Sequence, residues 1–167
     1  GITDSQLAPK AAEYVSNYIN NNLSKNSKIA WLGQQPPGYY SNMFDITSEM
    51  ISVDGLEHHF YDVVDCSSRS LYPFTQWNGN KPWDGIIKNY DLVVGVRITW
   101  LLNSANNLIS NLKYVIDNNK NAIFDFSTGN LTETDDKFTQ KRNEDDCNVV
   151  ANFYEFYKKQ MIYLFLS

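Results

Sequence analysis

The sequence predicts a single-domain α/β fold, a three-layer sandwich with a mostly parallel sheet. Short apolar stretches alternate along the chain with helical segments and loops, which is the pattern of strands joined by crossovers. Residues 91–98 are apolar almost throughout, as expected of a strand that is buried on both faces of a parallel sheet. The chain has 167 residues, which is enough for one domain around one sizeable core.

The first part of the chain contains an expected helix and three expected strands. Residues 4–23 carry apolar side chains at helical spacing, and Pro9 places the start of the regular helix close to Ala8. The three strands are expected at residues 28–32, 50–53 and 60–65. A short link at residues 56–59 is expected to join the second strand to the third.

The middle of the chain is expected to be irregular before regular elements return. Prolines and glycines punctuate residues 67–89, which predicts loops with a helical turn at 83–88, and residues 39–44 are expected to form another helical turn. The later elements are expected to be a strand at 91–98, a helix at 101–116, a strand at 122–126, a polar surface loop at 131–148, a helix at 149–159 and a last strand at 161–166. The domain therefore divides into an N-terminal helix (1–26), a core (27–127) and a variable part (128–167).

Charge and cysteine content narrow the classes of partner. The 14 Lys and Arg residues are outnumbered by 19 Asp and Glu residues, and no basic face is visible, so nucleic acid is not expected as a partner. Cys66 and Cys147 are isolated, which favours a reducing compartment such as the cytoplasm over a disulfide scaffold. No apolar run approaches the roughly 20 residues of a membrane span, and no signal peptide is recognised.

The expected ligand site lies at the carboxyl ends of the strands, where parallel α/β sheets bind small molecules. The first strand stops at Gly33, and a bend follows that contains Gln34, Gly38 and Tyr39. A glycine there lets the backbone approach a ligand closely. The bend is not a P-loop, because Tyr39 stands where that motif requires lysine.

Acidic residues follow the next two expected strands. Asp54, beside Gly55, lies 21 residues after Gly33, which matches the spacing of an acid that binds both ribose hydroxyls of a nucleotide. Its alternative role is a solvated acid in an Asp-Gly turn. Asp65 could accept a hydrogen bond from an exocyclic amine such as that of adenine, or it could act only as a turn or helix-capping acid.

Further candidates accompany these acids. Cys66 and Ser67 follow Asp65 directly and are expected to line the same part of the site. Arg97 ends the expected fourth strand, where its guanidinium either opens onto the cleft or forms a structural ion pair.

The order of these segments resembles class I S-adenosylmethionine-dependent methyltransferases, which are Rossmann-like. The resemblance rests on the glycine turn and on ISVDG, YDVVDCSSRSLYPF, NYDLVVGVRITWLL and NLISNLKYVIDNNKNAIFDFS. It implies S-adenosylmethionine as cofactor, the glycine turn at its amino-acid end, Asp54 on the ribose, Asp65 near adenine and a small-molecule or glycan acceptor. The turn WLGQQPPG departs from the family pattern E/D-x-G-x-G-x-G, so a non-catalytic binding or scaffold domain is the alternative. An oxidoreductase is less favoured, because no second domain for a substrate is visible.

The candidates for a catalytic base are few. His58 and His59 titrate near neutrality, and Asp125 lies close to a strand end, as do Tyr39 and Tyr40. The histidines could instead be partly exposed link residues, and Asp125 could pair with Arg97. No metal site is expected, because adjacent histidines in a strand point to opposite sides.

Overall fold

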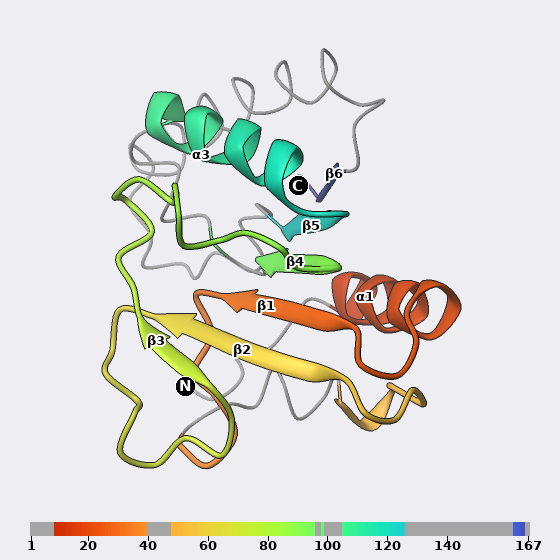
Figure 1. Ribbon diagram of the computed structural model, residues 1–167. Helices are drawn as coiled ribbons and strands as arrows, with labels where there is room; N and C mark the ends of the chain where they lie inside the picture. Colours follow the sequence, from red (N-terminus) through yellow and green to blue (C-terminus); the bar gives the residue numbers. More distant parts are fainter. Residues whose placement is uncertain (1–8, 40–47, 96–97, 99–104, 126–161, 166–167) are drawn as a thin grey trace, which may run out of the picture.

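The sheet is the central layer of the protein. The computed structural model describes residues 9–39, 48–95, 98, 105–125 and 162–165. Its strands, in chain order, are β1 (Lys28–Leu32), β2 (Glu57–Asp62), β3 (Phe74–Gln76), β4 (Leu92–Gly95), β5 (Ala122–Asp125) and β6 (Ile162–Phe165). They form one sheet in the order β3-β2-β1-β4-β5-β6, and every neighbouring pair is parallel (Figure 1). This order defines a Rossmann-like arrangement and confirms the predicted α/β class.

Strand β1 is enclosed on both sides of the sheet. It lies between β2 and β4, and its last four residues are buried. Successive side chains of a strand point to opposite faces, so Ile29 and Trp31 enter one core and Ala30 and Leu32 enter the other. Burial on both faces explains why this strand reads as a continuous apolar run.

Two helices cover the opposite faces. Helix α1 (Pro9–Asn22) packs Val15 and Ile19 against the face that contains Trp31. Helix α3 (Ala105–Asn118) covers the other face with Leu112 and Val115. The sheet with a covering layer on each side makes the three-layer sandwich that the sequence predicts.

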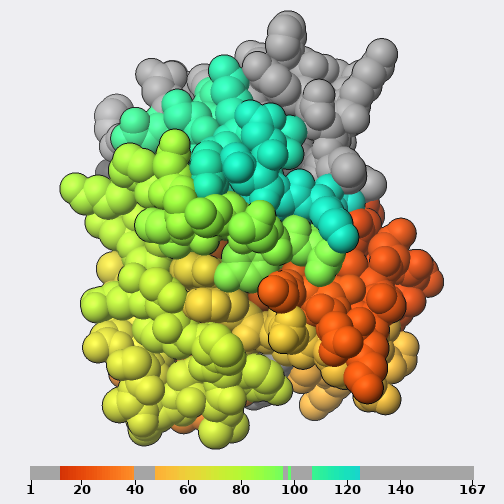
Figure 2. All heavy atoms as spheres, viewed as in Figure 1, coloured from red at the N-terminus to blue at the C-terminus, as the bar shows by residue number. Residues whose placement is uncertain are grey.

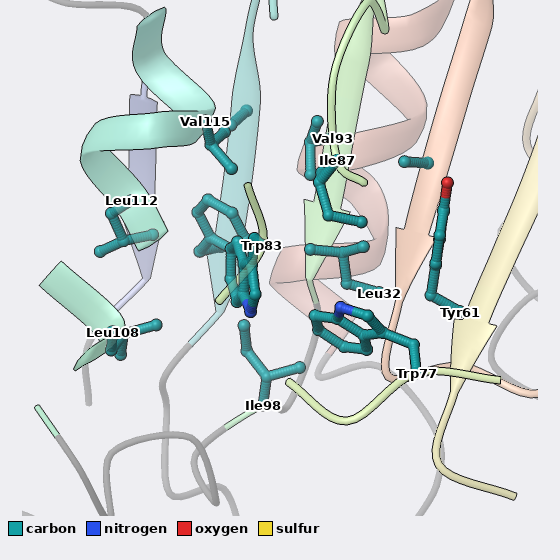
Figure 3. Close-up of a cluster of buried hydrophobic side chains, with 13 residues drawn as sticks. Leu32, Tyr61, Trp77, Trp83, Ile87, Val93, Ile98, Leu108, Leu112 and Val115 are labelled. Carbon is teal, nitrogen blue, oxygen red and sulfur yellow. The ribbon is translucent and has the colours of Figure 1, made fainter. Parts of the chain in front are cut away.

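The connection from β3 to β4 is a loop that packs on the α3 side of the sheet. Residues 77–91 are all described, and they contain no helix beyond a single turn near Trp83. Trp77 and Trp83 enter the core with their ring centroids 5.4 Å apart (Figure 3). In the space-filling view, the yellow-green atoms of this part of the chain cover much of the visible face (Figure 2). Aromatic burial thus replaces the helix that usually joins two parallel strands.

Side chains of α3 and of Asn119, which directly follows it, satisfy the backbone of this loop. The Trp83 N–H donates to Asn111 Oδ1 at 3.0 Å, and Asn111 Nδ2 donates to the Lys81 carbonyl at 3.2 Å. Asn119 Nδ2 donates to the Ile87 carbonyl at 2.9 Å, and its Oδ1 accepts the Tyr90 N–H at 2.9 Å. Buried backbone groups need such partners when no helix or strand supplies them.

The prediction of a strand at residues 50–53 is wrong. Helix α1 holds this stretch through Asn20, whose amide donates to the Met50 carbonyl at 2.9 Å and accepts the Ser52 N–H at 2.8 Å. The second strand is β2, which covers the expected link and the first half of the expected third strand. Met50 is 40% exposed, which is incompatible with a strand inside a parallel sheet.

The other expectations divide into three groups. The strand at 28–32 is confirmed, and strands β4, β5 and β6 and helices α1 and α3 fall in or near their expected ranges. The expectation that residues 67–89 are irregular is wrong in part, because they contain β3. The expected helical turn near Trp83 is present, since the Ile87 N–H donates to the Trp83 carbonyl at 3.1 Å. The loop at 131–148, the helix at 149–159 and most of the turn at 39–44 lie outside the described residues.

Replacement of Asn111 by leucine tests the role of the α3 side chains. Asn111→Leu keeps a similar volume but leaves the Trp83 N–H without its acceptor, so the free energy of unfolding is expected to fall by about 1–3 kcal/mol. Urea denaturation measures it. Asn107→Leu, at an exposed position of the same helix, is the control and is expected to change stability by less than about 0.5 kcal/mol. Equal effects of the two substitutions would contradict the interpretation.

Candidate functional site

The carboxyl edge of the sheet brings together the ends of four neighbouring strands. Gly33 follows β1, Asp62 ends β2, Trp77 follows β3 and Gly95 ends β4. All four strands point the same way, so their arrowheads lie on one side of the sheet in Figure 1. The strand order reverses between β1 and β4, and α/β sheets bind ligands at such a point.

The backbone of the glycine turn after β1 is hydrogen-bonded to the neighbouring strand β2. The N–H groups of Gly33 and Gln34 both donate to the Tyr61 carbonyl, at 2.7 and 3.1 Å. Gly33 has φ 66°, a left-handed conformation that suits glycine. Because those two N–H groups bind the end of β2, they do not form a cradle for a phosphate.

The second half of the turn packs against the loop that follows β2. Gly38 has φ 94°, and a Cβ there would lie 2.4 Å from the Arg69 carbonyl oxygen. The Leu71 N–H donates to the Pro37 carbonyl at 3.0 Å, and the Arg69 guanidinium lies 4.6 Å from the centre of the Tyr39 ring. Of the predicted cofactor residues, Gly38 and Tyr39 therefore stabilise a loop-to-loop contact beside the carboxyl edge.

The predicted position of Asp54 at the carboxyl edge is wrong. Asp54 and Gly55 precede β2, so they lie at the amino edge of the sheet. The Gly55 carbonyl accepts the Asn26 N–H there at 2.9 Å. A strand rises about 3.3 Å per residue, so the five residues of β1 separate this position from Gly33 by roughly 16 Å. A ribose cannot contact both residues.

Asp62 lies where the sequence placed Asp54. It ends β2 next to the turn at Gly33, and only 9% of its surface is exposed. Its Oδ1 accepts the Val64 N–H at 2.9 Å, and its backbone carbonyl accepts the Trp77 N–H at 2.8 Å. Burial raises the pKa of the carboxyl group, while hydrogen bonds from the backbone of Val64 and Val63 act in the opposite direction.

Sequence reasoning missed Asp62 because the expected strand ran through it to Asp65. The structure ends β2 three residues earlier and leaves Val63 and Val64 exposed by 58% and 39%. Two successive exposed valines after an acid do not distinguish a strand from a loop, so the signal was weak. Glu57–Asp62 shows no alternation of apolar and polar residues, since its burial rises steadily toward Asp62, so no clear signal in the sequence marks this strand.

Asp65, Cys66 and Ser67 form a compact turn after Asp62. Asp65 Oδ1 accepts the Ser67 Oγ–H at 2.6 Å and its N–H at 3.1 Å, and these bonds lower the pKa of the carboxyl group. The Cys66 thiol is buried, donates to the Val64 carbonyl at 3.4 Å and has a pKa raised to about 11, chiefly by burial. Asp65 therefore stabilises a turn, as the alternative role predicted. The raised pKa of Cys66 means that its thiol is not activated as a nucleophile.

His58 and His59 lie on opposite faces of β2, in its amino half. His58 Nδ1 accepts the Trp31 Nε1–H at 2.9 Å, and burial lowers its pKa to about 4. His59 Nε2 lies 2.8 Å from Thr75 Oγ1, and burial lowers the pKa of this ring too. Both rings are engaged in structural contacts away from the carboxyl edge, and they belong to strand β2 rather than to the expected link.

Three predicted residues are not placed with their side chains. Arg97 and Tyr40 lie outside the described residues. Asp125 ends β5 at the carboxyl edge, where only its backbone is described. Within the described ranges, no group of three or more His, Cys, Asp or Glu side chains could hold a metal ion. No helix in that part of the chain is long and apolar enough to cross a membrane.

The comparisons with known proteins add no family to this description. No protein-family model matches the sequence, and no curated protein matches it. The class of the protein is therefore defined by its fold alone, as a Rossmann-like α/β domain. The resemblance to methyltransferases stays a prediction.

The burial of His58 predicts a specific loss of stability in acid. The unfolded histidine, with a pKa near 6.5, gains a proton as the pH falls, whereas folded His58 stays neutral until about pH 4. Stability is therefore present above the unfolded pKa and is lost as the pH falls, at up to about 1.4 kcal/mol per pH unit between the two pKa values.

The His58→Gln variant measures this contribution. Glutamine keeps an acceptor for the Trp31 Nε1–H and does not titrate, so the free energy of unfolding is expected to vary less between pH 6.5 and 4 than in the natural chain. Urea denaturation at several pH values gives the slope. His59→Gln is the comparison, and it is expected to remove less of the slope because His59 is less affected by burial. An unchanged slope in His58→Gln would contradict the assignment.

Proposed function

We propose that the domain binds a nucleoside-containing cofactor at the carboxyl edge of its sheet, with S-adenosylmethionine as the candidate. In this proposal the protein transfers a methyl group to a small-molecule or glycan acceptor. The observation that carries it is the buried carboxylate of Asp62 at the end of β2, beside the left-handed turn at Gly33. An acid at that position is the usual partner of a ribose in Rossmann-like domains.

The chemistry of Asp62 supports this role. A ribose offers two adjacent hydroxyl donors, and an ionised carboxylate accepts only. The carboxylate of Asp62 can accept about four hydrogen bonds, and the Val64 N–H occupies one of these positions at Oδ1. The remaining positions are available to a ligand. Burial makes the ionised form unfavourable, and hydroxyl groups of a bound ribose would replace the lost water.

The remaining residues at the carboxyl edge would position the cofactor and the methyl acceptor and would not activate them chemically. Bound S-adenosylmethionine supplies an electrophilic methyl group on a sulfonium. The protein then needs mainly to hold the acceptor in line with that methyl group and to exclude water. The net charge of −5 supports a small acceptor over a nucleic acid, and the free thiol of Cys66 supports a reducing compartment such as the cytoplasm.

A non-catalytic binding domain is the second candidate. It is favoured by the Gly33 and Gln34 N–H groups, which donate to the Tyr61 carbonyl instead of facing a ligand. The two candidates share the nucleoside site at Asp62 and differ in turnover. Methyl transfer to an acceptor supports the first, and binding without transfer supports the second.

The Asp62→Asn variant tests the nucleoside site. S-adenosylhomocysteine is expected to bind the natural chain and to bind the variant at least about tenfold more weakly, because an amide offers one acceptor atom in place of two. Isothermal titration calorimetry measures both affinities. Asp54→Asn is the matched control at the opposite edge and is expected to leave the affinity unchanged.

Stability separates a lost site from a lost fold. The folded pKa of Asp62 is raised, so ionisation above the usual Asp pKa destabilises the native state, and Asn removes this penalty. Asp62→Asn is therefore expected to be at least as stable as the natural chain at pH 7. Binding that survives in Asp62→Asn but is lost in Asp54→Asn would overturn the site, as would binding of neither S-adenosylmethionine nor S-adenosylhomocysteine at millimolar concentration.

A further inference from the structure

A concave region lies at the amino edge of the sheet, on the far side from Asp62. Its inner hollow has a volume of about 290 Å³ and is lined in part by Lys28, Glu57, His59 and Tyr90. An outer hollow of about 490 Å³ continues from it and shares Lys28 and Tyr90 with it. The inner volume is at the lower end of the range for small-molecule sites.

Aromatic rings form rigid walls in the inner hollow. The His59 ring stacks on the Tyr61 ring at 4.5 Å and meets the Tyr90 ring edge-on at 6.4 Å. The hydroxyl groups of Tyr61 and Tyr90 lie 2.5 Å apart, and His59 Nε2 lies 2.8 Å from Thr75 Oγ1. These bonds fix the rings, so a planar ligand would meet surfaces that are already in place.

The charges of the lining favour one negative group. Lys28 and Lys88 contribute two ammonium groups and Glu57 one carboxylate, in a protein whose net charge is −5. The outer hollow adds Lys120, which is paired with Asp91 at 2.9 Å, and a further carboxylate, Asp117, so the excess of positive charge is confined to the inner hollow. In the described part of the chain, neither Lys28 nor Lys88 forms a salt bridge, although Asp91 interacts with Lys28 over a longer distance.

Asn89 adds a polar group between the two hollows. It lines both of them and has φ 67°, a left-handed backbone conformation that is uncommon outside glycine. Its N–H donates to the Asn118 carbonyl at 2.8 Å, which holds this conformation against α3. The side-chain amide offers a donor and an acceptor to a ligand.

We propose that this amino-edge hollow is a binding site for a small aromatic carboxylate. The planar body would pack against the Tyr90 and His59 rings, and the carboxylate would lie between the Lys28 and Lys88 ammonium groups. A phosphate carries nearly two negative charges at neutral pH, so the Glu57 carboxylate disfavours it relative to a single carboxylate. The site is independent of the proposed cofactor site, because the two lie at opposite edges of the sheet.

Titration with 2-naphthoate, followed by ¹⁵N NMR, tests the site. Saturable shifts are expected at the backbone amides of Asn89 and Tyr90, at millimolar concentration. Lys88→Gln and Lys28→Gln are each expected to weaken binding about two- to fivefold, as for partly exposed ion pairs, and the double variant more than either. Lys81→Gln is the matched control, because this exposed lysine belongs to the same loop and lines neither hollow.

Three further measurements decide the outcome. The uncharged 2-naphthamide is expected to bind more weakly than 2-naphthoate, inorganic phosphate is expected not to compete, and Asp62→Asn is expected to leave the titration unchanged. The proposal is overturned by the absence of saturable shifts, by equal effects of Lys81→Gln and Lys88→Gln, or by phosphate that competes as well as naphthoate. Failure of S-adenosylhomocysteine to bind would not affect this proposal, because that ligand tests the site at the carboxyl edge.

Discussion

The register of β2 against β1 determines what each neighbouring residue can do. Lys28 is paired with Glu57 and Leu32 with Tyr61, so the next residue of β2, Asp62, is brought to the turn at Gly33. The same register points His58 toward Trp31 and His59 toward Thr75. A slip by one residue would exchange the two faces of β2 and break the contacts of His58 with Trp31 and of His59 with Thr75. The proposed cofactor site and the histidine contacts therefore depend on one strand pairing.

Asparagine side chains hold the segments around the sheet in place. Asn20 on α1 binds residues 50–52 and keeps them out of the sheet, which leaves the place beside β1 to β2. Asn111 on α3 and Asn119, directly after α3, bind the loop that leads into β4. An amide side chain can donate and accept at once, so it replaces part of a missing helix or strand ladder. This explains how a loop without a helix can connect β3 to β4 in a parallel sheet.

The two edges of the sheet have different electrostatic character. The carboxyl edge presents a buried acid, Asp62, whose charge is weakly compensated by backbone N–H groups. The amino edge presents lysine ammonium groups around aromatic rings that hydrogen bonds hold in place. Hydroxyl donors suit the first edge and a single carboxylate suits the second. The two proposed sites lie about one strand length apart and would take ligands of different chemistry.

The sequence by itself determined the elements whose burial is uniform. Residues 28–32 and 91–98 read as strands because both faces of β1 and β4 are buried, and α3 showed its apolar stripe. Only the tertiary structure decided between residues 50–53 and Glu57–Asp62 as the second strand, since the more apolar stretch is captured by Asn20 and the more polar one is stabilised by contacts such as Trp31–His58. That choice moved the candidate ribose acid from Asp54 to Asp62. Spacing along the chain cannot reveal it, because the partners of both acids are distant in sequence and become neighbours only when the sheet forms.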